Sequence, residues 1–125
     1  MNISTLPQRS ASGLAHVTVL LVAGGARFTD LTRYLPHDWT VLRRTPDEPV
    51  LRDPDIVVLD DPGPRAVTAE CLRHPSSAIV VVLSPYSDHQ EVVDVLEAGA
   101  DACVRSNTTA VIAAHVEACR RRQAA

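Results

Sequence analysis

The residue types most suited to chemistry lie just after two strand-like apolar runs. Asp60 and Asp61 follow the run Ile56–Leu59, and Ser84 follows a similar run that ends at Leu83. Carboxylate and hydroxyl groups at one edge of a sheet can bind a cation or take part in group transfer. No histidine is predicted beside them, so the sequence offers no nucleophile–base pair, and the chain is not predicted to be an enzyme.

Five segments of strand length must position these groups. Three are almost entirely apolar, which is typical of strands covered on both faces, and two are shorter. In chain order the five are Val17–Val22, Thr40–Arg44, Asp55–Asp60, Ala78–Leu83 and Ala102–Arg105. Helical patterns alternate with them, which predicts a parallel sheet with right-handed connections and helices on both faces. The predicted fold class is therefore a doubly wound α/β domain of five parallel strands.

The first connections differ in how strongly they predict a helix. Phe28, Leu31 and Leu35 have helical spacing after the first strand, before a proline that ends the pattern. Pro64 suits the first turn of a helix that follows the third strand. The segment Thr45–Pro54 holds three prolines. The second helix of the alternating pattern is therefore predicted to be degenerate or missing, because proline breaks helices.

Capping signals bound the last two predicted helices. Ser87 is expected at the N-cap of one of them, with Gln90 completing a capping box three residues later. Gly99 fits the position just beyond the C-cap of the same helix. Asn107 or Thr108 is expected to cap the final helix.

The carboxyl ends of parallel strands meet at one edge of the sheet, and doubly wound folds bind their ligands there. The residues predicted at this edge are Ala23, Gly24, Asp60, Asp61, Ser84, Arg105 and Ser106. The glycine pair after the first strand is interpreted as a tight turn, because the G-x-G-x-x-G pattern of phosphate-binding loops is absent.

Length and composition fit one compact domain of 125 residues. The folded part is predicted to span residues 16–122. It would lie between a flexible, serine-containing tail at residues 1–15 and a tail or linker start at residues 123–125. Aromatic residues make up only 3% of the chain, so the core is expected to be aliphatic.

Charge and cysteine usage exclude several classes of function. A net charge of −3 gives no general attraction to nucleic acid or to an anionic membrane. No run is long enough to span a membrane and no export signal is recognised, so a cytoplasmic location is expected. Cys71, Cys103 and Cys119 lack metal-ligand spacing and are interpreted as reduced core residues, so no metal site is predicted.

Three segments together resemble the receiver domains of response regulators in two-component signalling. Pro54–Pro64 is similar to the family's third strand, which ends in the phosphoacceptor aspartate, here Asp60, with a proline four residues later. Ser84 stands at the switch serine or threonine, and Glu97–Arg105 is close to the Gly-Ala-Asp segment before the last strand. The resemblance runs from about residue 17 to residue 122. It implies a flavodoxin-like sheet of order 2-1-3-4-5.

The sequence departs from this family at most of the residues that handle the phosphoryl group. The acidic pair that holds Mg²⁺ falls on Ala23 and Gly24, and the lysine falls on Arg105 or Ser106, in a chain without lysine. The aromatic switch falls on Cys103, which has no ring. Because the acidic pair is missing, Mg²⁺ is expected to bind poorly, and no cofactor is predicted. Without the metal, Asp60 and an incoming phosphoryl group about 4 Å away would repel by roughly 4 kcal/mol at an effective dielectric of about 20.

The resemblance also implies a homodimer through the last strand and the two helices that flank it. Its apolar centre would be Val95, Ala113 or Val116. Ion pairs around that centre would come from Asp101, Arg105, Glu117, Arg120 and Arg121. A two-fold interface is self-complementary, so opposite charges on one patch suit it.

The leading hypothesis is an atypical receiver that signals through protein contacts and dimerisation, without Mg²⁺-dependent phosphorylation. It could be the regulatory domain of a transcription factor, with a histidine kinase or an output domain as partner and no direct contact with nucleic acid. One alternative is a functional phosphorelay receiver phosphorylated on Asp60. The other is a small-ligand-binding module on the same scaffold.

Overall fold

The computed structural model describes residues 16–45, 48 and 53–124. Five parallel strands form one sheet in the order β2-β1-β3-β4-β5, which confirms the predicted fold class and strand order. The strands are β1 (Thr18–Val22), β2 (Thr40–Arg44), β3 (Ile56–Asp60), β4 (Ala78–Leu83) and β5 (Ala102–Arg105). The helices are the 3₁₀-helix η1 (Leu31–Tyr34) and the α-helices α2 (Pro64–Arg73), α3 (His89–Glu97) and α4 (Thr109–Ala124).

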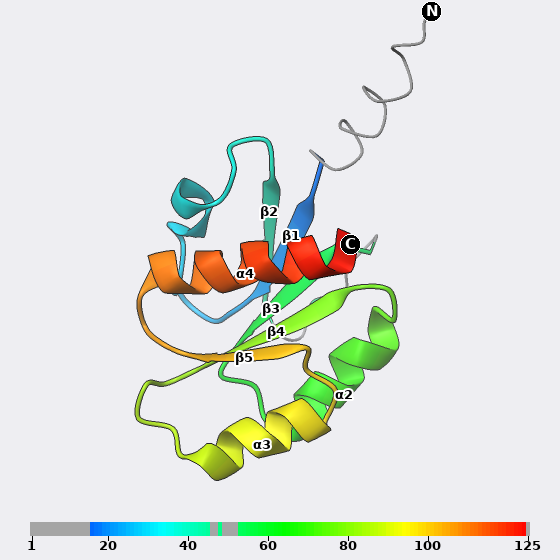
Figure 1. Cartoon of the computed structure of the whole chain (residues 1–125), viewed down its shortest axis with the longest axis vertical. Coiled ribbons are helices and arrows are strands. Elements are labelled where there is room, and N and C mark those ends of the chain that lie inside the picture. The colour runs from blue at the N-terminus through cyan, green and yellow to red at the C-terminus, as the bar shows by residue number, and fades with distance from the viewer. Residues whose placement is uncertain (1–15, 46–47, 49–52, 125) are drawn as a thin grey trace, which may run out of the picture.

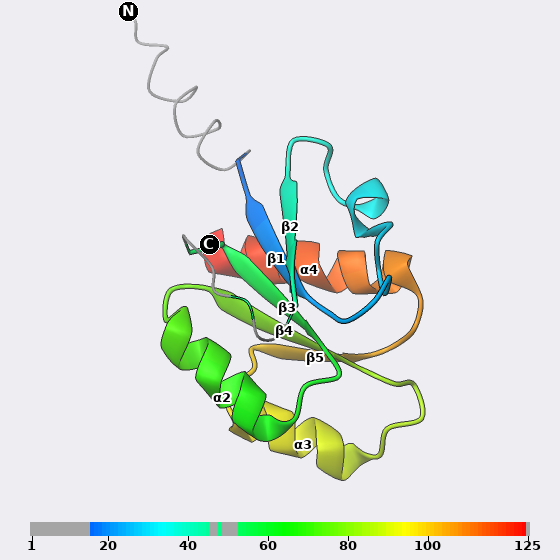
Figure 2. The same cartoon turned by 180° about the vertical axis from the view of Figure 1, so that it is seen from behind.

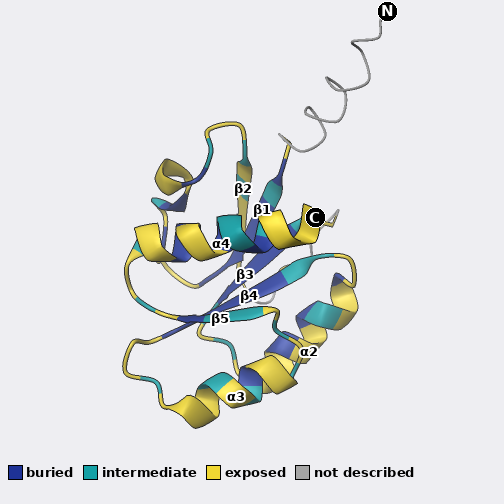
Figure 3. Cartoon of the chain, in the orientation of Figure 1, coloured by how far each residue is buried: buried dark blue, intermediate teal, exposed yellow. Residues whose placement is uncertain are grey.

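The sheet separates two aliphatic core layers, and the helices cover both of its faces (Figures 1 and 2). One layer lies between the sheet and α4 with η1, and it includes Leu21, Val58 and Val116. The other lies between the sheet and α2 with α3, and it includes Val22 and Leu59. Buried residues therefore alternate between the two layers along each central strand, as a doubly covered parallel sheet requires. Figure 3 shows this burial along the strands.

The helix predicted from Phe28, Leu31 and Leu35 is the largest difference from the sequence prediction. Only the four residues of η1 are helical, and residues 25–30 form turns. Gly25 and Phe28 have φ values of +59° and +57°. These left-handed conformations interrupt a right-handed helix. The three apolar side chains are nevertheless buried against the sheet.

The boundaries of the later helices follow the predicted signals with one shift. Asp88, rather than Ser87, caps α3, and Glu91 completes a capping box with it. Gly99 follows the C-cap with a φ of +124°, as predicted, and a Cβ atom there would lie 2.7 Å from Cys71 Sγ. Helix α4 continues through Gln123 and Ala124, beyond the predicted end of the domain at residue 122.

Three predictions lie wholly or partly outside the described residues. They concern the N-terminal tail at 1–15, most of the segment Thr45–Pro54, where the helix is predicted to be degenerate or missing, and Ala125. Among the described residues, no helix is both long enough and apolar enough to cross a bilayer.

Candidate functional site

Asp60 ends β3 at the carboxyl edge of the sheet, and an arginine binds both of its carboxylate oxygens. Arg27 Nε lies 3.1 Å from Oδ2 and Arg27 Nη2 lies 3.1 Å from Oδ1. The side chain of Asp60 is 10% exposed, whereas that of Arg27 is 48% exposed. The hydrogen bond to Asp60 raises the pKa of Arg27. This two-pronged contact, which we call the fork, is the strongest geometry available to an arginine–carboxylate pair.

The loop after β1 presents Arg27 to Asp60. Gly25, two residues before Arg27, turns the chain in a left-handed conformation. Phe28, the residue after Arg27, inserts its ring into the core. The Arg27 guanidinium also lies 4.6 Å from the centroid of the Phe28 ring, within the range of cation–π contacts. The buried ring therefore anchors the loop beside the arginine.

A second arginine holds this loop from the neighbouring strand. Arg43 belongs to β2 and is paired with Leu21 of β1. Its Nη1 donates to the carbonyl oxygen of Arg27 and its Nη2 to that of Gly25, each at 2.6 Å. One guanidinium thus satisfies two carbonyl groups of a segment that has no helix to bond them.

The residues at the expected metal-binding positions carry no oxygen in their side chains. Ala23 is buried and its amide donates to the carbonyl of Arg44, while Gly24 is exposed. Asp61 is exposed on a left-handed backbone with φ of +52°, and its amide donates to the carbonyl of Val82. Asp61 therefore adds a second carboxyl group to this edge, next to Asp60 in the chain.

The other predicted pocket residues bond to groups in the loops after β4 and β5. Ser84 Oγ accepts a hydrogen bond from the Tyr86 amide at 3.1 Å, and Ser106 Oγ accepts one from the Thr108 amide at 2.9 Å. Arg105 donates to the carbonyl of Ser87 at 3.0 Å. Ser84 follows β4, Arg105 ends β5 and Ser106 follows β5, as predicted. The two serines stabilise their own turns, and Arg105 bonds across to the loop after β4.

Cys103 lies half-buried in β5, opposite Val81, at the position of the expected switch. It packs against the core layer under α2 and α3. Burial raises the pKa of its thiol, against a smaller opposite effect of Arg105. Its small side chain adds to the core and presents no ring.

The residues predicted for a dimer face have different surroundings in the structure. Val95, Ala113 and Val116 are buried in the cores, because the apolar faces of α3 and α4 pack on the sheet. These three side chains are at most 2% exposed, so in this structure they belong to the core. Three other apolar side chains are exposed instead on α3 and at the start of α4, namely Val93, Leu96 and Val111.

The charged residues predicted for the same face have other surroundings. Glu117, Arg120 and Arg121 line a hollow beside Trp39, on the flank of α4 near β2. Arg120 also lies 3.7 Å from Asp55. Asp101 accepts a hydrogen bond from the Ile79 amide, at the amino end of β4. Arg105 alone is on β5, which α3 and α4 both contact.

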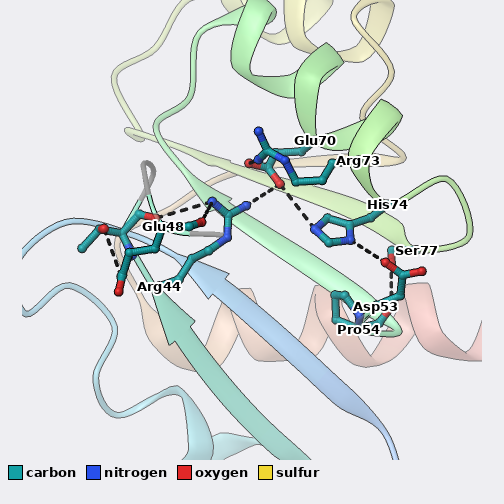
Figure 4. Close-up of polar contacts among 9 residues, drawn as sticks. Arg44, Glu48, Asp53, Pro54, Glu70, Arg73, His74 and Ser77 are labelled. Carbon is teal, nitrogen blue, oxygen red and sulfur yellow. Dashed lines mark hydrogen bonds and ion pairs between the residues drawn. The ribbon is translucent and has the colours of Figure 1, made fainter. Parts of the chain in front are cut away.

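A buried charged cluster lies on the α2 face of the sheet, and the sequence did not predict it (Figure 4). Glu70 of α2 binds Arg44 of β2 and Arg73, and His74 Nε2 lies 3.8 Å from the same carboxylate. His74 Nδ1 lies 2.9 Å from Asp53. The cluster ties the edge strand to α2 and to the start of the segment before β3.

The comparisons with solved structures agree with this architecture. A response regulator from Thermotoga maritima has a TM-score of 0.70 at 16% identity, over 85% of this chain and 98% of that one. A CheY-like receiver domain protein from Methanospirillum hungatei JF-1 has 0.70 at 18%, over 86% and 95%. A LuxR family DNA-binding response regulator from Silicibacter pomeroyi has 0.66 at 20%, over 84% and 92%.

The chain has the fold of a receiver domain. No protein-family model and no curated protein sequence matches it. At identities of 20% or less, the comparisons bear on the receiver fold alone. Within that fold, Asp60 occupies the end of the central strand, which confirms the structural basis of the resemblance.

Sequence reasoning missed Arg27 and Arg43, the two residues that determine the surroundings of Asp60. Arg27 comes three residues after Gly24, and receiver domains have an acidic residue at the position of Gly24. The chain also has arginine and no lysine. That combination was the available signal. The pairing itself depends on the left-handed turns of the loop, which spacing alone does not predict.

Proposed function

We propose that this chain is a receiver-type signalling module that works by protein contact and does not depend on Mg²⁺-assisted phosphorylation. The observation that carries the proposal is the contact of Arg27 with both carboxylate oxygens of Asp60, in a receiver fold. Each oxygen of a carboxylate held in this way already accepts a charged hydrogen bond, which lowers its nucleophilicity toward a phosphoryl donor. The absence of lysine from the chain supports the same proposal.

The test is incubation of the protein with acetyl phosphate and Mg²⁺, followed by intact mass measurement. The expected result is no stable gain of a phosphoryl group. Asp60→Asn is the matched control, because it removes the acceptor oxygen and keeps the size of the side chain. A stable gain in the wild type that disappears in Asp60→Asn would identify a phosphorelay receiver instead.

The proposed contact is a homodimer through the exposed apolar residues of α3 and α4. Val93 and Leu96 are one helical turn apart on α3, and they are 39% and 42% exposed. Apolar surface of this kind is a common component of interfaces. We expect Leu96→Glu to shift the protein toward monomer in analytical ultracentrifugation. Leu72→Glu is the control, because Leu72 is even more exposed but lies on α2. Equal mass distributions for wild type and Leu96→Glu would count against this face.

The proposed partners are a histidine kinase or an output domain in the cytoplasm. Two structural neighbours support this class. One is the LuxR family DNA-binding regulator, and another is the receiver domain of a signal transduction histidine kinase from Syntrophus aciditrophicus. The net charge of −3 favours protein partners over direct binding of nucleic acid by this domain.

A second candidate function is the binding of a small ligand beside Asp60. A hollow of about 420 Å³ there has an apolar floor of Val22 and Leu59 and charged residues including Asp61 and Arg73. Its volume is in the range of small-molecule sites. A thermal-shift screen of metabolites tests this candidate. A ligand that stabilises the wild type, but not Arg73→Gln, would favour it.

A further inference from the structure

The residues around Asp60 do not fit the Mg²⁺ ion that the receiver fold implies. Mg²⁺ requires near-octahedral coordination by oxygen atoms. Ala23 and Gly24 supply no side-chain oxygen at the expected positions, and Arg27 takes up both oxygens of Asp60. A metal ion at this carboxylate would have to displace the guanidinium and remain close to its positive charge.

We propose that Arg27 is a resident counter-cation that excludes divalent metal ions from Asp60, and that Arg43 is the positioning residue that keeps it there. This inference deepens the proposed function, and it rests on the same edge of the sheet. Arg27 neutralises one carboxylate with one fixed charge, so the site needs no ion from solution. The acceptor-equivalent aspartate is thereby kept in a single paired state.

The geometry of Arg43 gives it the positioning role. It bonds the carbonyl oxygen of Arg27 itself, so it restrains the backbone from which the fork extends. It also bonds the carbonyl of Gly25, the left-handed turn that directs the loop toward β3. The α-helix expected after β1 is absent over these residues, so the loop relies on such side-chain bonds for its conformation.

The charges explain why the fork and a divalent ion compete. A guanidinium and a divalent cation on one carboxylate would be a few ångström apart, and their repulsion is several-fold larger than the thermal energy even at a surface dielectric. Removing Arg27 releases Asp60 and leaves Asp61 as a second carboxyl group on the adjacent residue. The exclusion therefore depends on one side chain, which makes it testable.

The experiment measures binding of Mn²⁺ to the whole chain by electron paramagnetic resonance. Wild type is expected to show no saturable binding that depends on Asp60. Arg27→Gln is expected to show saturable binding, at least about tenfold tighter than the weakest binding that the measurement resolves, because a competing charge is removed. Arg43→Gln should shift binding in the same direction by a smaller factor. Arg33→Gln, an exposed arginine of η1, is the matched control and should behave as wild type.

A spectroscopic readout separates positioning from a purely structural role. The Nε–H resonance of Arg27 is expected to be protected from exchange in the wild type and to lose that protection in Asp60→Asn. It should also lose protection in Arg43→Gln, while the midpoint of urea unfolding stays near that of Arg33→Gln. Protection that survives in Arg43→Gln would overturn the role of Arg43.

A double variant and a conservative variant of Arg27 test the exclusion of metal from Asp60 further. The gain of Mn²⁺ binding in Arg27→Gln must disappear when Asp60→Asn is added. A gain that survives, or no gain at all in the folded variant, would overturn the proposal. Should Arg27→Gln not fold, Arg27→Lys tests the same point, because an ammonium cannot bond both oxygens in parallel. It should show a smaller gain in the same direction, and unchanged binding would count against the fork.

The two proposals fail in different ways. Phosphorylation of the wild type on Asp60 without saturable Mn²⁺ binding would reject the proposed function and leave metal exclusion in place. Saturable Mn²⁺ binding to the wild type that Asp60→Asn removes, without any phosphorylation, would reject metal exclusion alone.

Discussion

Arg44 at the end of the edge strand and Glu70 on α2 form a buried ion pair, although they are separated by 26 positions in the chain. Both side chains are almost completely removed from solvent. Arg44 also donates to the carbonyl of Glu48, so it reaches from the strand toward two other segments. The pair lies on the face of the sheet that α2 covers. It thereby links β2 to α2 directly.

Replacing Glu70 by Gln should destabilise the protein more than any exposed charge substitution. The change leaves the buried Arg44 without its carboxylate, and breaking a buried pair in this way costs about 3 kcal/mol or more. Urea unfolding monitored by circular dichroism checks the prediction. Glu97→Gln on exposed α3 is the control and should change stability by about 0.5 kcal/mol or less. Similar unfolding midpoints for the two variants would show that the buried cluster is dispensable.

Gly99→Ala should also destabilise the fold. The residue has a φ of +124°, and a Cβ atom would approach Cys71 Sγ to 2.7 Å. We expect a loss of about 2 kcal/mol in the free energy of unfolding, from backbone strain and the steric contact together. Adding Cys71→Ala should recover only the steric part. Gly63→Ala, where a Cβ has open space, should cost a few tenths of a kcal/mol.

The contact between Arg27 and Asp60 should contribute modestly to stability in spite of its geometry. Arg27 is half-exposed, so solvent screens the pair, and a double-mutant cycle should give a coupling of about 1 kcal/mol. The coupling should fall when NaCl is raised toward about 1 M, where the Debye length is about 3 Å. A coupling of zero at low salt would mean that the fork does not persist in solution.

The thiol of Cys103 should react slowly with iodoacetamide and gain reactivity only at high pH. Burial raises its pKa above the ordinary value of 9.0, so less thiolate is present in the folded protein than in an unfolded one. By linkage, the corresponding stability is fully present below pH 9 and is lost as pH rises through the folded pKa. Alkylation rates followed by mass spectrometry, with Cys103→Ser as control, test this. Faster alkylation of the folded than of the unfolded chain at pH 8 would contradict it.

The sheet could be predicted from the sequence because its signals are local. Apolar runs such as Ala78–Leu83 are covered on both faces, and their length and composition already determine strand and burial. The position of Asp60 at the strand end followed directly. The residues around Asp60 did not, because the fork from Arg27 depends on two left-handed residues and on a side chain from another strand.

Two other differences arise from competition between equally plausible local signals. Ser87 and Asp88 are adjacent N-cap candidates, and each has a capping-box partner three residues later. Asp88 is the cap in the structure, where a carboxylate also complements the helix dipole. The apolar residues Val95, Ala113 and Val116 were assigned to a dimer face, but helices that cover a sheet use their most apolar positions for the core.

Arg43 and Arg44 are adjacent in β2, and because successive side chains of a strand alternate, they serve opposite faces of the sheet. Arg43 holds the loop that carries Arg27, and Arg44 binds Glu70. A slip of β2 by one residue would place each guanidinium on the wrong face and break both sets of contacts at once. Edge strands are the part of a sheet most prone to mispairing. The two arginines therefore favour the observed register of this edge strand through their charged contacts. The contacts around Asp60 depend on the same register.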